Sequence, residues 1–550
     1  MSRKLQLTQS YWDLDDSRAT LETTLGDLLA SLAGKVPDRT ALVEGTADAS
    51  KRRRWTYRQL LTSAETVARA LLQHFKPGER VAVWSANSAE WVFLQHGASL
   101  AGLVLVTVNP AYLSAELSHV LATSGAAGIF YTNSYRGHDM AETVRALRPH
   151  LPGLRVAISF SDWDEFVAGG DASTPLPRVE PGDMIQIQFT SGTTGKPKGA
   201  CLHHRGVINA ARFTAMRAGV RDGAPWASAM PLFHVGGCAG SEIGAFSVGG
   251  TFVLLPAFDA GVMLELIETE RVQHIHAVPT MVSAMLDHPD RPQRDLSSLG
   301  SIMSGGSNVA ASLVKRASET FGCNFTITFG QTELNGVICQ TFPDDPPERQ
   351  STTIGQPSPQ MEVKIADPNT GEVLPLGQPG EIWARGYQTM LGYFNADASA
   401  SQAITSDGWL KTGDQATMDA AGYLRITGRL KDCIIRGGEN IYPREIEDVL
   451  LTHPSIREVN VVGVPDPTWG EVVAAAIKLH PSVPRPPALD FHEFSRKHLA
   501  PYKTPVMWFY VDEFPTTTSG KVQKFQLRQL MADGSLQPEP FVKPQRRPVG

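Results

Sequence analysis

Two hydrophobic patterns alternate over roughly the first 350 residues. One repeats apolar residues three and four positions apart, as in TYRQLLTSAETVARALLQHF (56–75), and predicts amphipathic helices. The other is a short run rich in β-branched and aromatic residues, as in RVAVWS (80–85), LVLVTVN (103–109) and GIFYT (128–132), and predicts buried strands. Such alternation is typical of an α/β fold with a largely parallel sheet. It resumes at 252–280, which predicts a second α/β unit.

After about residue 350 the pattern changes to short strands between Gly and Pro, with a turn predicted at PNTGE (368–372). From about Lys431 helix and strand patterns return over a length that suits a separate small domain. We therefore expect an α/β fold with two domains. The N-terminal domain spans 1–430, with two α/β subdomains followed by a β-rich subdomain at about 350–430, and a small α+β C-terminal domain spans 431–550.

Composition narrows the class of protein. The 550 residues are too many for one hydrophobic core, and 42% hydrophobic with 19% charged residues is ordinary for a soluble globular protein. A net charge of −6 argues against a nucleic-acid-binding surface. The five cysteines contain no CxxC pair, which favours reduced thiols and a cytoplasmic protein. We expect no secretory signal and no transmembrane helix, because no long apolar run occurs.

The segment FTSGTTGKPKGA (189–200) has the composition of a phosphate-binding loop. Its glycines let backbone N–H groups approach an anion, and its hydroxyl groups and lysines add donors and charge. Its spacing is not that of a Walker loop, because only two residues separate Gly192 from Gly195 and Pro197 follows Lys196 where a helix would begin. This disfavours a P-loop kinase or ATPase. The alternative is a flexible surface turn without a ligand. This alternative is weakened by the composition, since eight of the twelve residues are Gly, Ser, Thr or Pro and the segment lies between apolar flanks.

Seven further motifs follow this loop in order. They are PLFHVGG (231–237), SGGS (304–307), FGQTE (329–333), GWLKTGD (408–414), GRLKD (428–432), RGGENIYPREIE (436–447) and TSGKVQK (518–524). With TSGTTGKPKGA, they resemble the adenylate-forming superfamily of acyl-CoA synthetases, nonribosomal adenylation domains and beetle luciferases. One motif alone is weak, but seven in order across nearly the whole chain are specific. RGGENIYPREIED and SGKVQKFQLR look most similar to the medium-chain fatty-acyl-CoA synthetase branch.

The resemblance implies a reaction in two halves, with ATP, Mg²⁺ and CoA as cofactors. A carboxylate attacks the α-phosphate of ATP to give acyl-AMP and pyrophosphate, and the CoA thiol then displaces AMP to give a thioester. The C-terminal domain is expected to be mobile and to swing about a hinge at Lys431. One pose would bring Lys521 to the reacting groups, and the other would bring Gly437, Gly438 and Glu439 to the pantetheine arm of CoA.

Four residues have catalytic roles implied by the resemblance. Lys521 would contact the carboxylate and the α-phosphate as a point charge. Glu333 would be the magnesium ligand, since Mg²⁺ needs few protein ligands, and Thr332 would donate to the α-phosphate. His234 has two interpretations that we keep open, either a residue near the acyl carboxylate or a core histidine. A general base is not required, because a carboxylic acid is already ionised at pH 7.

The implied nucleotide site combines glycines with one aromatic ring and one carboxylate. Phe329 occupies the place where the family usually has Tyr, so the ring face for the purine is kept and the hydroxyl is lost. Asp414 would accept hydrogen bonds from the ribose hydroxyls, with Arg429 nearby in the sequence. The full set comprises Thr190, Ser191, Gly192, Thr193, Thr194, Gly195, Lys196, Lys198, Gly305, Gly306, Ser307, Phe329, Gly330, Gln331, Asp414 and Arg429.

The implied acyl pocket is apolar. It contains no Arg or Lys for a second carboxylate and no Asp for an α-amine, so we expect an aliphatic medium-chain or a bulky alicyclic acid. Four other histidines (His203, His204, His274 and His276) are expected to be structural, and no fused carrier domain is expected. The pocket residues are Phe233, Val235, Gly236, Phe258, Val278, Pro279, Leu334, Asn335 and Gly336.

Three functions remain to be compared. The first is an acyl-CoA synthetase, and the second is an acyl-AMP ligase that loads a separate carrier protein with the same residues. The third, a catalytically inactive nucleotide-binding protein, is disfavoured because the nucleotide and lysine positions are intact. Luciferase-like oxygenation is compatible with the superfamily, but no residue calls for it. Expected partners are a small carboxylic acid and CoA or a carrier protein, with a homodimer among the assemblies considered.

Overall fold

The computed structural model describes residues 6–190, 197–306, 309–395, 400–481, 483–516 and 522–540. The chain divides into two compact units. The larger unit comprises Met1–Lys364, Trp383–Thr412 and Met418–Arg425. The smaller unit comprises Ile365–Ile382, Gly413–Thr417 and Ile426–Gly550, and so takes in two short segments of the predicted β-rich region besides the C-terminal part.

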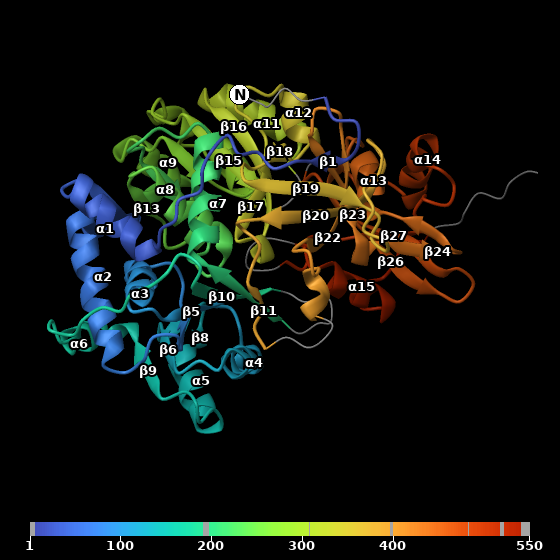
Figure 1. Cartoon of the computed structure of the whole chain (residues 1–550). Helices are drawn as coiled ribbons and strands as arrows, with labels where there is room; N and C mark the ends of the chain where they lie inside the picture. The colour runs from blue at the N-terminus through green and yellow to red at the C-terminus, as the bar shows by residue number, and fades with distance from the viewer. Residues whose placement is uncertain are drawn as a thin grey trace, which may run out of the picture. The chain divides into compact units, whose positions relative to one another are not determined.

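The first sheet of the larger unit has seven strands and carries the predicted phosphate loop. Its order is β21-β11-β10-β5-β4-β6-β9, parallel from β10 to β9 and antiparallel at β10–β11 and β11–β21. The strands predicted at 80–85, 103–109 and 128–132 are confirmed as three parallel neighbours, and Figure 1 shows α4 beside β5. The strands are β4 (Arg80–Trp84), β5 (Val104–Val108), β6 (Gly128–Tyr131), β9 (Val156–Ser159), β10 (Met184–Thr190), β11 (Lys198–His203) and β21 (Gly392–Tyr393).

Helices form the connections that parallel strands require. The helix predicted at 56–75 is confirmed as α2 (Tyr57–Leu72), which begins with a capping box between Thr56 and Gln59. Side-chain caps from Thr24 and Ser88 begin the two helices packed against it. The helices around this sheet are α1 (Leu25–Lys35), α3 (Ala89–Leu100), α4 (Ser114–Ser124), α5 (Met140–Leu147) and α6 (Trp163–Ala168), and a small hairpin joins β7 (Ser134–Tyr135) to β8 (His138–Asp139).

The second sheet has nine strands in the order β18-β17-β16-β15-β14-β12-β13-β2-β3. It is parallel from β16 to β2 and closes with antiparallel strands at both ends, which confirms the second α/β unit. Its strands are β2 (Thr40–Glu44), β3 (Arg54–Thr56), β12 (Trp226–Ser228), β13 (Phe252–Leu254), β14 (His274–His276), β15 (Ser301–Gly305), β16 (Asn324–Gln331), β17 (Gly336–Gln340) and β18 (Gln356–Pro357).

A buried apolar cluster lies between this second sheet and its helices. It includes Ile275 and Ile302 from the strands together with Leu266 and Val314 from the helices. The helices of this region are α7 (His204–Arg217), α8 (Gly244–Ser247), α9 (Ala260–Thr269), α10 (Pro279–Asp287), α11 (Ala311–Phe321) and α12 (Pro347–Thr352), and a π-helix, η4, spans Gly236–Ile243.

The predicted β-rich region is confirmed as strands of a third sheet, in the order β1-β19-β20-β22-β23. The predicted turn at 368–372 lies between Ala366 and Val373, which form an antiparallel bridge, and Gly371 has a φ of +75° there. The strands are β1 (Tyr11–Trp12), β19 (Met361–Ala366), β20 (Gly380–Gly386), β22 (Leu410–Met418) and β23 (Leu424–Arg429).

The C-terminal part of the smaller unit is α+β, as predicted. Its sheet runs β25-β24-β27-β26, with β28 parallel to β27. Apolar side chains of α13 and α14 pack in one cluster and those of α15 in another, so the sheet is covered on both faces. The elements are β24 (Ile434–Arg436), β25 (Glu439–Ile441), α13 (Pro443–Leu450), β26 (Ile456–Asp466), β27 (Gly470–Leu479), α14 (Ala488–His498), β28 (Met507–Tyr510) and α15 (Lys524–Ala532).

Within the part of the chain that the structure describes, no helix combines the length and apolar character needed to cross a membrane.

Candidate active site

Glu333 is the centre of the polar cluster in the larger unit. It lies in a 3₁₀ turn (Thr332–Leu334) directly after β16, and its backbone oxygen accepts from the N–H of Met390 at 3.0 Å. Its Oε1 accepts from Thr190 Oγ1 at 3.1 Å and from Tyr393 Oη at 2.8 Å. The structure thus brings the predicted magnesium ligand to the start of the predicted phosphate loop, although the two are 143 residues apart in sequence.

Tyr393 contacts the predicted magnesium ligand and was not predicted from the sequence. It lies on β21, opposite Ala200 of β11, and the Nζ of Lys198 lies 5.6 Å from the centre of its ring. Burial and the neighbouring Glu333 carboxylate both raise the pKa of Tyr393, so its hydroxyl stays protonated and donates to Glu333 at neutral pH. The motif around Tyr393 is too short to predict a strand, and only the pairing of β21 with β11 brings its ring to the site.

The phosphate loop connects two paired strands. Phe189 lies opposite Gly199 and Thr190 opposite Lys198, so β10 and β11 form the two arms of a hairpin. A Cβ on Gly199 would lie 2.7 Å from Ile187 Cγ2, which explains a glycine at this position. Eight predicted site residues lie outside the described residues: Ser191, Gly192, Thr193, Thr194, Gly195, Lys196, Ser307 and Lys521.

The predicted adenine-binding residues lie at the ends of β15 and β16. Gly305 and Gly330 leave room for neighbouring backbone, since a Cβ would lie 2.4 Å from Thr328 O and 2.2 Å from Gly336 O respectively. Gly306 has a φ of +77°. Phe329 is partly exposed, and Gln331 Nε2 donates to the Thr412 backbone oxygen at 3.0 Å. These glycines therefore have a packing role in addition to any contact with a ligand.

Asp414 and Arg429 come together in the smaller unit. They lie on β22 and β23, and Arg429 Nε contacts Asp414 Oδ1 at 2.7 Å. The Asp414 side chain is 4% exposed and that of Arg429 is 47% exposed. The adjacent Gly413 N–H donates to Glu381 Oε1 at 2.8 Å. The predicted ribose carboxylate is therefore buried and paired with Arg429.

His234 lies two residues before the π-helix η4 and is partly exposed. Its Nδ1 accepts from the Gly236 N–H at 3.1 Å, and its backbone oxygen accepts from Gly237 and Cys238. Thr107 Oγ1 donates to the Phe233 backbone oxygen at 2.7 Å, which ties this segment to β5. A histidine in this setting orders the start of η4 and also reaches the surface, so both interpretations of His234 stay open.

The other predicted acyl-pocket residues fall into two groups. Val278 and Pro279 begin α10 and are partly exposed, whereas Phe258 packs against the buried cluster of the second sheet. Leu334 and Asn335 are fully buried. Asn335 accepts from the His203 N–H at 3.1 Å and donates to the Gln388 backbone oxygen at 2.9 Å, and it is followed by Gly336 with a φ of +136°. Asn335 therefore connects three segments around Glu333.

The predicted CoA-binding residues form the tip of the β24–β25 hairpin. Gly437 and Gly438 have φ values of +59° and +87°, as a two-residue type I′ turn requires. The Gly437 N–H donates to the Trp469 backbone oxygen at 2.8 Å, and the Arg436 guanidinium lies 5.1 Å from the centre of the Trp469 ring. Arg436 Nη1 also donates to the Tyr502 backbone oxygen at 2.9 Å.

Two exposed aromatic rings accompany this hairpin, and sequence reasoning had not singled them out. Trp469 is 49% exposed beside Gly437 and the cation of Arg436. Tyr502, whose backbone oxygen accepts from Arg436, is 37% exposed. Glu439 begins β25. The Trp469 ring and the Arg436 cation therefore lie together beside the two glycines of the hairpin.

Two lysines near the predicted hinge and catalytic loop differ in setting. Lys431 is exposed in a 3₁₀ turn (Leu430–Asp432) between β23 and β24, a position compatible with a hinge. Lys524, the last residue of the TSGKVQK motif, is not an ordinary surface lysine. Its side chain is only 24% exposed, and its Nζ contacts Glu447 Oε1 at 2.5 Å and the Val461 backbone oxygen at 3.2 Å.

The four remaining predicted histidines have the structural settings that were expected. His203 caps α7, and His204 Nδ1 accepts from the Leu25 N–H at 3.1 Å. His274 and His276 lie on β14, where each contacts a serine hydroxyl. Burial lowers the pKa of His204 and of His276 to about 4, so both are neutral at pH 7. The described residues contain no group of three or more His, Cys, Asp and Glu that could hold a metal ion.

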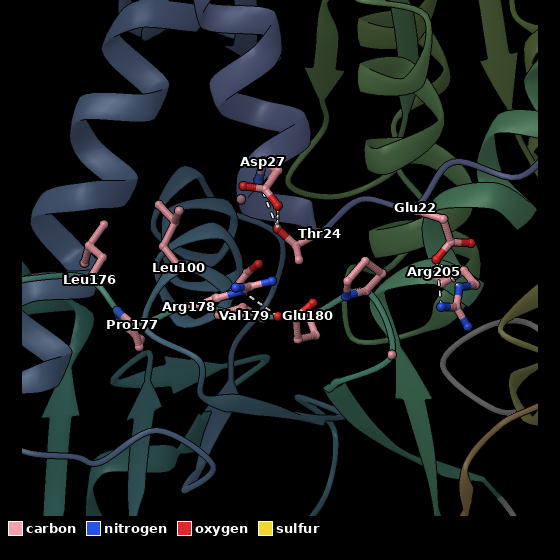
Figure 2. A pocket seen from close by; sticks show the side chains of 14 residues that line it. Glu22, Thr24, Asp27, Leu100, Leu176, Pro177, Arg178, Val179, Glu180 and Arg205 are labelled. Carbon is pink, nitrogen blue, oxygen red and sulfur yellow. Dashed lines mark hydrogen bonds and ion pairs between the residues drawn. The ribbon is translucent and has the colours of Figure 1, made fainter.

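A cavity of about 750 Å³ lies elsewhere in the larger unit. Figure 2 shows two ion pairs in its lining, Arg205 with Glu22 and Arg178 with Glu180, and Asp27 bonded to the Thr24 hydroxyl. None of the predicted site residues lines it.

Comparisons with known proteins agree with the geometry. The family described as AMP-binding enzyme matches residues 29–394, and the AMP-binding enzyme C-terminal domain matches residues 445–521. The medium-chain acyl-CoA ligase ACSF2, mitochondrial, of Danio rerio is 35% identical, over 95% of this chain and 91% of that protein. The acyl-CoA ligase sidI of Aspergillus fumigatus is 34% identical, over 93% of this chain and 92% of that protein. The crystal structure of the anthranilate CoA ligase AuaEII with anthranoyl-AMP superposes with a TM-score of 0.84 at 26% identity, over 94% of this chain and 99% of that one.

Proposed function

The chain belongs to the AMP-binding enzyme family, and from that premise we propose that it is an ATP-dependent acyl-CoA synthetase. It activates a hydrophobic carboxylic acid as acyl-AMP with release of pyrophosphate, and transfers the acyl group to the thiol of CoA. The observation that carries this proposal is the contact of Glu333 with Thr190 and Tyr393, because it joins the carboxylate after β16 to the start of the phosphate loop. The names of the relatives point to the same class of reaction.

The first half-reaction needs charge stabilisation rather than covalent chemistry from the protein. Mg²⁺ prefers oxygen ligands and commonly binds one or two carboxylates together with phosphate oxygens, so the single Glu333 carboxylate suits it. When bound, the ion would neutralise charge on the phosphates of ATP. Thr190 and Tyr393 orient Glu333, Thr332 offers a hydroxyl beside it, and the loop from Thr190 to Lys198 holds the phosphate groups. Lys521 contributes a positive charge to the developing oxyanion.

The nucleotide is recognised by Gly305, Gly306 and Phe329 on the adenine side and by Asp414 on the ribose side. A carboxylate that is 4% exposed and already fixed by Arg429 can accept from ribose hydroxyls with little loss of conformational entropy. The adenine lies against the ring face of Phe329 and the adjacent backbone.

The second half-reaction uses the hairpin at Gly437 and Gly438. Two small residues with positive φ leave space for a narrow thiol arm, and the Trp469 ring with the Arg436 cation suits the nucleotide part of CoA. We propose that the C-terminal domain, residues 431–550, alternates between the two half-reactions by rotation about Lys431. Carrier-protein loading by an acyl-AMP ligase is the alternative, with the same adenylation residues.

The acid is proposed to be a medium-chain aliphatic or bulky alicyclic acid, bound against Phe233, Val235, Gly236 and Val278. The five cysteines carry free thiols, which suits a reducing compartment, and we propose the cytoplasm. The homodimer considered from the sequence stays a prediction that light scattering of the purified protein would check.

One experiment tests the proposed function. The purified protein is incubated with ATP, Mg²⁺, a panel of linear and alicyclic acids, and either CoA or a carrier protein bearing phosphopantetheine. Acid-dependent pyrophosphate with an acyl-CoA product supports the proposal. Acid-dependent pyrophosphate with acylation of the carrier protein alone favours the alternative. ATP bound without turnover for any acid contradicts both, and Lys521→Ala should abolish most pyrophosphate release while leaving the protein folded.

A further inference from the structure

A continuous chain of buried polar side chains crosses the core of the larger unit. Glu242 of η4 accepts from Gln95 Nε2 at 2.9 Å and contacts His96 Nε2 at 2.8 Å. Gln186 Nε2 donates to Gln95 Oε1, and Gln188 Nε2 donates to Gln186 Oε1 at 2.8 Å. Each of these five side chains belongs to a residue that is at most 2% exposed.

The series of hydrogen-bonded side chains contacts η4 at a second position. Gln188 Nε2 contacts Cys238 Sγ at 3.2 Å, and Cys238 lies one helical turn before Glu242. The polar side chains of α3 and β10 therefore hold η4 at two positions. On another side of η4, Ser241 Oγ donates to the Gly236 backbone oxygen and contacts His276 Nδ1 at 2.9 Å.

Stability alone does not call for this arrangement. Ten of the twelve residues of α3 are buried, so Gln95 and His96 occupy positions where apolar side chains would pack. Replacing buried ionic pairs by apolar groups of similar volume is often neutral or stabilising. His96 Nδ1 has no hydrogen-bond partner among the described residues, and burial raises the pKa of Glu242 while His96 and Gln95 lower it. This cluster therefore costs desolvation that an apolar core would avoid.

The two elements that the cluster joins are those that carry the two reacting groups in the proposed reaction. β10 ends at Thr190, where the phosphate loop begins. η4 follows His234 and carries Gly236 and Gly240, which are both partly exposed. A Cβ on Gly236 would lie 3.3 Å from Met230 Cε and one on Gly240 would lie 3.4 Å from His276 Cε1, so glycine fits both positions. The two glycines leave this partly exposed side of η4 without side chains, as a strip on which an acid could lie.

We propose that Glu242 is a positioning residue that, through Gln95, Gln186 and Gln188, sets the acid-bearing strip of η4 against Thr190 at the end of β10. The inference rests on the proposed function. The residue that it adds, Glu242, touches neither ATP nor the acid. Because adenylation depends on the distance between the carboxylate and the α-phosphate, a shift of about 1 Å between η4 and β10 would lower the rate by about 100-fold.

Two variants separate positioning from stability. The apolar variant is Gln95→Leu/His96→Phe/Glu242→Leu. It replaces the polar side chains by apolar ones of similar size and removes the hydrogen bonds between α3 and η4. The new phenyl ring at position 96 would pack beside Phe246, whose ring centre is 5.5 Å from that of His96. Glu242→Gln keeps an acceptor for Gln95 and offers an N–H to the ring of His96, which can carry its own proton on Nδ1. The matched control, called the β14 control, is His274→Leu/Ser301→Ala, which removes a similarly buried histidine–hydroxyl pair between β14 and β15.

The readouts are the thermal midpoint, the affinity for ATP by calorimetry, and kcat/KM for the acid by pyrophosphate release. We expect the apolar variant to keep wild-type ATP affinity and to lose about 100-fold in kcat/KM, with Glu242→Gln within about threefold of wild type. The thermal midpoint of the apolar variant should fall somewhat, because the buried Gln186 Nε2 loses its acceptor on Gln95. Full activity in the apolar variant would overturn the inference, as would an equal loss in Glu242→Gln or in the β14 control. Failure of the proposed function is distinct, because wild type itself would then release no acid-dependent pyrophosphate.

Discussion

At the scale of single residues, the site depends on side chains whose neighbours come from distant parts of the chain. The motif FGQTE predicted Glu333, but the two hydroxyl groups that orient it come from Thr190 and Tyr393. Tyr393 carries no sequence signal that distinguishes it from any other aromatic residue. Its role follows from the pairing of β21 with β11.

Tyr393→Phe tests that role. The change removes one hydrogen bond to an ionised group, a contribution of about 1.5–3 kcal/mol, so adenylation should slow by about tenfold or more and need a higher Mg²⁺ concentration. Pyrophosphate release at varied Mg²⁺ measures both effects. The control is Tyr131→Phe on β6 of the same sheet, which should behave as wild type; equal behaviour of the two variants would remove Tyr393 from the site.

The buried histidines predict how stability depends on pH. Burial lowers the pKa of His276 to about 4 from its usual 6.5, so between these values the unfolded chain binds a proton that the native protein does not. Each such histidine should therefore cost about 1.4 kcal/mol of stability per pH unit as the pH falls from 6.5 towards 4. Urea denaturation of wild type and of His276→Gln at pH 7.5 and 5.0 measures this. A loss on acidification that is the same for both proteins would contradict the assignment.

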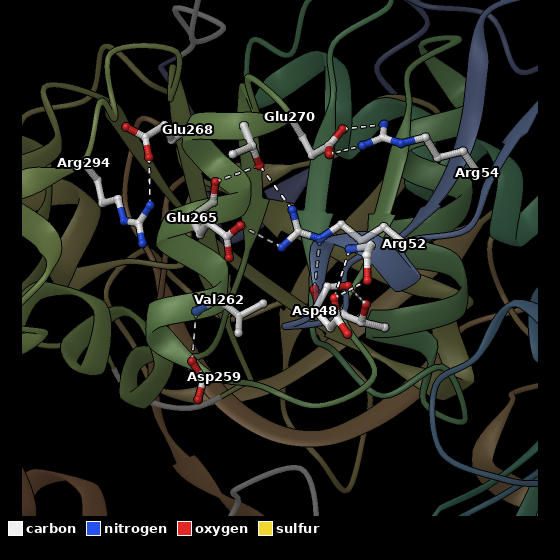
Figure 3. A network of polar contacts seen from close by, with 12 residues as sticks. Asp48, Arg52, Arg54, Asp259, Val262, Glu265, Glu268, Glu270 and Arg294 are labelled. Carbon is white, nitrogen blue, oxygen red and sulfur yellow. Dashed lines mark hydrogen bonds and ion pairs between the residues drawn. The ribbon is translucent and has the colours of Figure 1, made fainter.

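At the scale of elements, arginines in and just before β3 hold this strand to α9 and its C-terminal end. Figure 3 shows Arg52 reaching Glu265 of α9 and Arg54 reaching Glu270. The Arg52 side chain is 4% exposed, its contact to Glu265 measures 3.0 Å, and its Nε donates to the Thr46 backbone oxygen at 2.9 Å. The composition of the run KRRRW (51–55) is typical of a charged surface segment, but the Arg52 side chain within it is buried.

Arg52→Ala should destabilise the protein by about 3 kcal/mol, because it leaves a partly buried carboxylate and a backbone oxygen without their donor. Arg58→Ala is the control, since Arg58 and its partner Asp38 are 64% and 84% exposed and such a pair contributes almost nothing. Chemical denaturation gives both values. A loss for Arg52→Ala no larger than for Arg58→Ala would show that the pair is not structural.

The hairpin of the smaller unit makes a prediction about one half-reaction only. Trp469→Ala removes the exposed ring beside Gly437 and Arg436, so it should raise KM for CoA by about tenfold, as loss of a stacking ring does, and leave pyrophosphate release unchanged. Phe525→Ala on α15 removes a ring that is 65% exposed and should change neither. Thioester formation with CoA varied is the measurement. A loss of pyrophosphate release in Trp469→Ala would contradict a role confined to CoA.

At the scale of the whole molecule, the sequence predicted the type of each element better than it predicted which strands and side chains meet. The strands β4, β5 and β6 and the helix α2 were predicted because each carries its own hydrophobic period. The pairing of β2 with β13 was not predicted, because its residues are 210 positions apart in sequence and meet only through long-range packing. The polar cluster around Glu242 was missed for the same reason, since Gln95, Gln186 and Glu242 have unremarkable local sequences. Eight of the predicted site residues lie outside the described part of the chain, so their roles stay predictions.

The central claim is that a carboxylate oxygen of the acid attacks the α-phosphate of ATP and is retained in the AMP product. Supplying an accepted acid labelled with ¹⁸O in its carboxylate, together with ATP, Mg²⁺ and CoA, and analysing the products by mass spectrometry, tests it directly. The account predicts one ¹⁸O atom in AMP and the other in the thioester carbonyl. Label in inorganic phosphate with ADP as the product, or AMP that contains no ¹⁸O, would contradict it.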